Sequence, residues 1–112
     1  SGIVSDFLKL LEANYRNEKT VSFYAKQLGI APDYLSVLVR KKLNRTPKDV
    51  IVKRISTEGQ RLLLSSRLSI KEISYTLGFS TVGSFSVFIK NNTGLPPKLL
   101  REEMFESATS DF

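Results

Sequence analysis

The sequence contains no cysteine and no histidine, and these two absences together exclude several kinds of chemistry. Disulfides and thiolate nucleophiles need cysteine, and structural zinc sites use cysteine and histidine. Histidine is also the usual proton shuttle near neutral pH, so catalysis would depend on carboxylates or lysines. For the candidate carboxylates, helix capping or solvation is the simpler explanation: Glu58, Glu72, Glu102 and Glu103. We therefore predict no enzymatic activity, no metal and no cofactor.

Long apolar segments are missing as well. No stretch approaches the ~20 consecutive apolar residues of a membrane span, and no charged-then-apolar signal peptide opens the chain. The 112 residues are enough for one domain with a modest core. Together with the lack of cysteine, these features favour a cytoplasmic location.

Acidic residues are outnumbered by basic ones. The chain has 17 Lys and Arg against 11 Asp and Glu, a net charge of +6. A basic excess in a small domain is typical of proteins that bind polyanions, most often nucleic acid, although it can also serve solubility alone.

Capping residues, turn glycines and apolar periodicity predict an all-α fold of about seven helices. Asn14 and the polar residues after it end the first helix, and a Ser69–Glu72 capping box starts the fifth. The predicted helices cover about 4–13, 21–28, 33–43, 47–65, 70–77, 82–93 and 97–104. The polar tail 106–112 is expected to fray.

Two parts of the chain repeat each other. Residues 25–30 match 74–79, and residues 35–40 match 85–90, at offsets of 49 and 50. Each copy predicts a short helix, a glycine-led turn and a longer helix, which is the helix-turn-helix pattern. An apolar residue after each glycine is expected to fill the angle between the helices, so the predicted turn residues are Gly29, Ile30, Gly78 and Phe79. A plain helical bundle is the alternative, but two copies that are each followed by a proline-started helix favour helix-turn-helix units.

The most distinctive residues follow the first copy. They are Arg54-Ile55, Glu58-Gly59-Gln60-Arg61-Leu62-Leu63, Ser69-Ile70-Lys71-Glu72-Ile73, Leu77-Gly78-Phe79, Phe85, Phe88-Ile89-Lys90, Thr93-Gly94, Pro97 and Arg101. This combination resembles the AraC/XylS-type family of bacterial transcription regulators, and the resemblance extends from Phe7 to Arg101. Departures are Gly59, where alanine is usual, and Val37 and Val87, where arginine often contacts a base.

The resemblance implies one DNA-binding domain over 1–112. Its parts would be subdomain one at about 3–45, a linking helix at about 47–66 and subdomain two at about 69–106. Two recognition helices would enter successive major-groove segments of double-stranded DNA. It further implies an upstream sensor domain, absent from this chain, that binds the effector. We also expect contact with RNA polymerase.

Base readout is predicted on the outward faces of the third and sixth helices. The candidates are Asp33, Ser36, Val37 and Arg40 in the first unit, and Val82, Gly83, Ser84, Ser86 and Val87 in the second. Arg40 suits either guanine or phosphate, and Asp33 suits either cytosine or the helix N-terminus. Because Ser-Val recurs at both outward sites, we predict a shared A/T-containing element in half-sites ~34–36 Å apart.

Phosphate contacts are predicted from the cations Lys41, Lys42, Arg45, Lys53, Lys71, Lys90, Lys98 and Arg101. For Lys48 and Lys53, the alternative to a phosphate contact is a simple solvated position on the surface. For Arg54, the alternative is a structural role as the buried partner of Glu58. Seven Lys and Arg between Arg40 and Arg54 face one acid, Asp49, so the first unit is expected to anchor the domain. The competing function is a helical protein-interaction module that contacts the transcription machinery, favoured by the outward valines. RNA binding is disfavoured because no aromatic stacking platform is evident.

Overall fold

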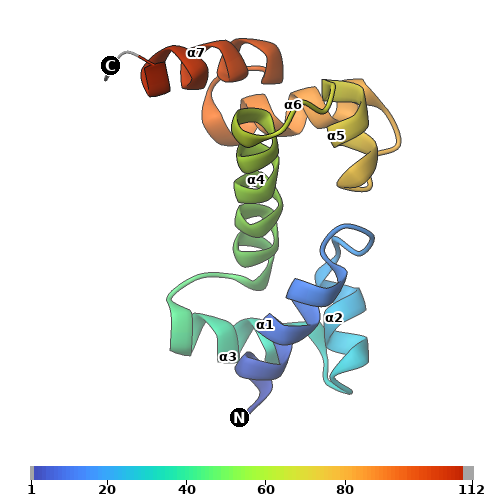
Figure 1. Ribbon diagram of the computed structural model, residues 1–112. Helices are drawn as coiled ribbons and strands as arrows, with labels where there is room; N and C mark the ends of the chain where they lie inside the picture. The colour runs from blue at the N-terminus through green and yellow to red at the C-terminus, as the bar shows by residue number, and fades with distance from the viewer. Residues whose placement is uncertain (1, 110–112) are drawn as a thin grey trace. The chain divides into compact units, whose positions relative to one another are not determined.

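The computed structural model describes residues 2–109, and within that range the regular secondary structure is entirely helical, as predicted (Figure 1). The helices are α1 (Ile3–Asn14), α2 (Val21–Gln27), α3 (Pro32–Leu43), α4 (Pro47–Ser65), α5 (Ile70–Thr76), α6 (Val82–Thr93) and α7 (Pro97–Thr109). None of these described helices is long and apolar enough to cross a membrane.

Helix α7 is the main departure from the predicted boundaries. It continues to Thr109, whereas the sequence was expected to leave the helix near Met104 and to fray from Glu106. That expectation is wrong as far as Thr109, because no glycine or proline interrupts the segment and polar residues such as Glu and Ser are tolerated in an exposed helix. Residues 110–112 of the predicted frayed tail lie outside the described residues.

The chain divides into two compact units, Ser1–Ile55 (unit 1) and Ser56–Phe112 (unit 2), and α4 contributes residues to both. In unit 1, α1 packs against α2 and α3. The buried rings of Phe7 and Tyr24 meet edge to face, with centroids 5.6 Å apart. The Tyr24 hydroxyl donates to the Glu18 carbonyl at 2.7 Å, and burial raises the pKa of Tyr24 to about 12. Its polar end is therefore satisfied without leaving the core.

In unit 2, α6 packs against both α5 and α7. Ile73, Leu77, Phe85 and Ile89 are fully buried there. Gly59 of α4 lies in the same core, where an added Cβ would come within 3.1 Å of Ile89 Cδ1. An alanine at this position would therefore require the Ile89 side chain to shift slightly.

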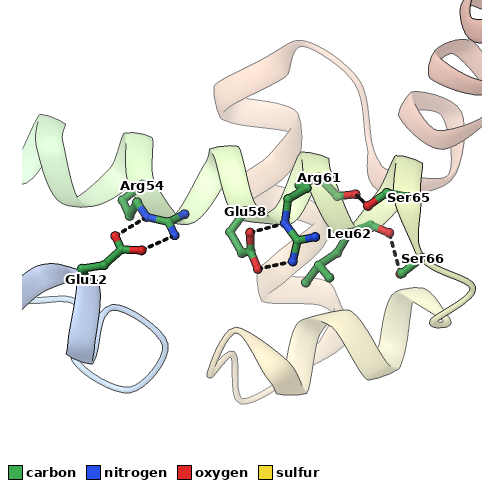
Figure 2. A network of polar contacts seen from close by, with 7 residues as sticks. All are labelled: Glu12, Arg54, Glu58, Arg61, Leu62, Ser65 and Ser66. Atoms are coloured by element: carbon green, nitrogen blue, oxygen red, sulfur yellow. Dashed lines mark hydrogen bonds and ion pairs between the residues drawn. The ribbon is translucent and has the colours of Figure 1, made fainter.

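Helix α4 ends without a left-handed cap residue, and side chains satisfy its last carbonyls instead. The Ser65 and Ser66 hydroxyls each donate at 2.6 Å, to the carbonyls of Arg61 and Leu62 respectively (Figure 2). Arg101 of α7 donates from Nε to the Leu63 carbonyl at 2.8 Å. These bonds end the longest helix of the fold and connect it to α7 within unit 2.

Candidate nucleic-acid interface

Both units contain the same turn between two helices. The predicted turn residues Gly29 and Gly78 have φ values of 69° and 78°, in the left-handed region that glycine occupies without strain. The next amide closes each turn: Ile30 N donates to the Ala25 carbonyl at 3.0 Å, and Phe79 N donates to the Ser74 carbonyl at 2.9 Å. This helix C-terminal hydrogen-bonding pattern sets where α3 and α6 begin relative to α2 and α5.

The recognition helices α3 and α6 bury equivalent positions and expose equivalent positions. Leu35 and Val39 are fully buried in α3, as are Phe85 and Ile89 in α6. On the outward faces Val37 is 59% exposed and Val87 is 60% exposed. Among the other predicted readout residues, Asp33, Arg40, Gly83 and Ser84 are exposed, whereas Ser36, Val82 and Ser86 are half-buried. Each helix therefore buries one face and leaves the opposite face, which contains the outward valine, open to solvent.

The two recognition helices begin differently. Ala31 precedes α3 and provides no side-chain cap, whereas the Thr81 hydroxyl accepts from Ser84 N at 3.0 Å at the start of α6. The Ser84 hydroxyl in turn donates to the Thr81 carbonyl at 2.8 Å and accepts from the Thr81 hydroxyl at 3.1 Å. Ser84 therefore has only one lone pair left for any contact with a base.

An exposed aromatic residue on α3 was missed by the sequence-based prediction. Tyr34 is 51% exposed in the first turn, directly after Asp33. Its exposure could have been predicted from the helical spacing. Tyr34 lies three residues before the outward Val37, which places it near the same face, and one residue before the inward Leu35. Asn91 of α6 was also missed by the sequence-based prediction. It is exposed and directly follows the exposed Lys90.

Most of the predicted phosphate-contacting cations are exposed. These are Lys41, Lys42, Arg45, Lys53, Lys71, Lys90 and Lys98. The Lys71 ammonium lies 6.0 Å from the ring centroid of the exposed Tyr75. Arg101 is different because it is partly buried and two of its nitrogens donate to the Leu62 and Leu63 carbonyls. Arg101 therefore has a structural role, which is to bind the last carbonyls of α4. A phosphate contact by Arg101 stays a prediction.

Arg54 has a structural role within unit 1. Its Nε and Nη2 each donate at 2.8 Å to the two carboxylate oxygens of Glu12 (Figure 2). Its guanidinium carbon also lies 4.2 Å from the ring centroid of the buried Tyr15. A bidentate ion pair to Glu12 of α1 and a cation–π contact with Tyr15, the residue after α1, together connect the unit 1 part of α4 to the C-terminal end of α1. The alternative pairing with Glu58 stays a prediction.

Unit 2 contains a buried carboxylate. The Glu58 side chain is 6% exposed and accepts from Arg61 Nε at 2.7 Å and Arg61 Nη2 at 2.8 Å (Figure 2). Both carboxylate oxygens of Glu58 are therefore paired within α4. Over the described part of the chain, no group of three or more acidic residues is placed to hold a metal.

Charge separates the two units. Unit 1 holds eleven Lys and Arg against five Asp and Glu, whereas unit 2 holds six of each. The whole excess of +6 therefore belongs to unit 1. The two helix-turn-helix units therefore match in their turn glycines and buried helix positions but differ in net charge.

Comparison with known proteins gives consistent matches over most of the chain. A sequence profile of a family described as a helix-turn-helix domain matches residues 24–103. The Msm operon regulatory protein of Streptococcus mutans is 34% identical over 101 residues, which are 90% of this chain and 36% of that protein. The chain therefore spans about a third of the length of this relative.

Solved structures match the fold. The C-terminal domain of AraT, a response regulator from Geobacillus stearothermophilus, is 27% identical with a TM-score of 0.84, covering 92% of this chain and 86% of that one. The DNA-binding domain of AdpA, solved in complex with a target DNA, has a TM-score of 0.83 at 17% identity and covers 100% of both chains. The likeness to AdpA is one of fold.

Proposed function

The chain belongs to the AraC/XylS-type helix-turn-helix family, and on this basis we propose that it binds double-stranded DNA sequence-specifically to regulate transcription. The observation that carries the proposal is the pair of equivalent outward faces on α3 and α6, each behind a glycine-led turn. A single exposed helix of this kind fits a major groove about 12 Å wide. The two helices would enter successive major-groove segments.

Base readout in this proposal is stronger in unit 1. Arg40 is exposed and has the fork geometry for guanine, while Ser36 can donate or accept. Val37 and Val87 suit thymine methyl groups, which supports half-sites that share an A/T-containing element ~34–36 Å apart. Asp33, in the first turn of α3, is suited to the helix N-terminus or to cytosine. The remaining proposed readout residues are Val82, Gly83, Ser84 and Ser86.

Phosphate contacts complete the proposed interface. The exposed cations Lys41, Lys42, Arg45, Lys53, Lys71, Lys90 and Lys98 are the proposed contacts, with Arg101 contributing only the part of its guanidinium that the α4 carbonyls leave available. We further propose contact with RNA polymerase, an effector-binding sensor domain upstream of this chain, and a cytoplasmic, nucleoid-associated location.

Binding-site selection with randomised duplexes at two salt concentrations tests the proposal. We expect an enriched pair of related half-sites, and log K should fall with log salt at a slope of about −5 if about six phosphates are neutralised. A slope near zero, with no enrichment, would contradict DNA as the ligand. That result would favour the protein-interaction alternative, for which the exposed valines would be the contact residues.

A further inference from the structure

The turn between α3 and α4 carries an unusual density of exposed cations. Five of them lie within nine residues, and we call this set the basic turn: Arg40, Lys41, Lys42, Arg45 and Lys48. None of the five has an ion-pair partner in the part of the chain that the structure describes. The nearby acid, Asp49, caps α4 instead, because its carboxylate accepts from Thr46 N at 3.4 Å. The basic turn is therefore free to bind an external anion.

Helix stability alone does not explain this set. Cations in the last turn of α3 do favour the helix C-terminus, and Arg40, Lys41 and Lys42 lie there. Lys48, however, is the second residue of α4, where the helix N-terminus disfavours a positive charge. Arg45 lies between the helices, on the turn that follows the left-handed Asn44. The helix dipole therefore accounts for Arg40, Lys41 and Lys42 but does not account for Arg45 or Lys48. What the five residues share is their position on or beside one turn.

Unit 2 provides an internal comparison at an offset of 50 residues. The turn between α6 and α7 has the same backbone pattern, with Gly94 at φ 91° where Asn44 has φ 57°. Its five equivalent positions keep only two cations: Lys90, Asn91, Asn92, Leu95 and Lys98. The shared turn geometry therefore does not require the basic residues, and three of the charges in unit 1 need another explanation.

We propose that the basic turn is the sequence-independent anchor of the domain, which binds the phosphate backbone of any duplex, while the neutral unit 2 engages DNA only at a matching half-site. The inference rests on the proposed DNA-binding function and assigns its salt-dependent part to a defined surface. Phosphate neutralisation is sequence-independent and supplies most non-specific affinity. In a complex with non-specific DNA, only unit 1 would therefore bind the duplex. The outward face of α6 would add affinity only where the base sequence matches its half-site.

The test measures equilibrium binding of the whole chain to a 30-base-pair duplex of random sequence between about 50 and 200 mM salt. Lys41→Gln/Lys42→Gln removes two charges from the basic turn and keeps helix propensity. We expect a salt slope shallower by about 1.8 and affinity about tenfold or more weaker at 0.1 M salt. The matched control, Lys9→Gln/Lys26→Gln, removes two exposed charges of unit 1 outside the basic turn and should change the slope by less than about 0.5. Thermal unfolding of each variant checks the fold.

A reciprocal variant tests the role of unit 2. Asn91→Lys/Asn92→Lys copies two charges of the basic turn onto the same turn geometry and should make the slope on random duplex steeper. The proposal is overturned if the Lys41/Lys42 variant keeps the wild-type slope, if the Lys9/Lys26 control loses as much, or if the reciprocal variant keeps the wild-type slope. A wild-type chain that binds no duplex at all would instead contradict the proposed function, and the inference with it.

Discussion

The two units are built alike and charged differently. Their recognition helices bury equivalent residues to completion and expose Val37 and Val87 to the same degree, 59% and 60%. Yet unit 1 carries the entire net charge of +6, and unit 2 carries none. A few inward and turn positions therefore suffice to specify the helix-turn-helix unit, and the outward positions can diverge without changing it.

The largest expected effect is a loss of stability on removing a core side chain, and it tests whether the cores of the two units are equivalent. Leu35→Ala and Phe85→Ala remove fully buried side chains from matching places in α3 and α6. Each should destabilise its own unit by roughly 2–5 kcal/mol, because burial is lost and a cavity remains. Urea unfolding followed by residue-resolved hydrogen exchange would check this. A substitution that lowers protection equally in both units would show that the units do not unfold separately.

The next effect sharpens the difference in base readout. Val87→Arg places a guanidinium on the outward face of α6, where the wild-type chain has an exposed valine. Binding-site selection should then return a guanine in the corresponding half-site, with a preference of about 1–3 kcal/mol over other bases. The matched variant Val37→Arg should do the same in the other half-site. No new base preference with Val87→Arg would mean that α6 does not face the groove through this residue.

A smaller effect concerns how the recognition helices start. Thr81→Ala removes the cap of α6 and should cost about 1 kcal/mol of stability in unit 2. The reverse change, Ala31→Thr, introduces a capping side chain at the uncapped start of α3 and should stabilise unit 1 by up to about 1 kcal/mol. Thermal unfolding measures both. Equal melting temperatures for Thr81→Ala and wild type would remove the capping explanation.

The smallest effect is a pH dependence that belongs to unit 2. The Ser69 backbone N–H, and then its hydroxyl, lower the pKa of Glu72 below its ordinary value of 4.5. Because the folded pKa lies below the unfolded one, the stabilisation is present above pH 4.5 and is lost as the pH falls through the lowered value. Glu72→Gln can still accept the Ser69 N–H but cannot titrate there, so its unfolding curve should lose this acid-sensitive component. Identical pH profiles for the two proteins would contradict the assignment.

Helix boundaries could be predicted well because local chemistry determines them. Thr20 and Ser69 cap the helices that follow them, and Gly29 and Gly78 take the left-handed conformation that the turns require. The all-α class and the repeated units followed from these signals. The extension of α7 to Thr109 was missed because the polar residues after Met104 predict fraying, although no glycine or proline interrupts the segment.

Side-chain roles that depend on distant contacts could not be predicted. The Arg54–Glu12 pair spans 42 residues, and Arg101 finds the α4 carbonyls 38 and 39 residues away. Neither partner can be identified from spacing along one helix. The reduced hydrogen-bonding capacity of Ser84 is local, but it depends on a rotamer that the sequence does not reveal.

A residue-resolved NMR titration with a random-sequence duplex at low salt tests the difference between the units most directly. The account predicts that amide shifts concentrate in the basic turn, residues 40–48, while the equivalent residues 90–98 of unit 2 stay near their free positions. Equal shifts in the two turns, or larger shifts in unit 2, would contradict it.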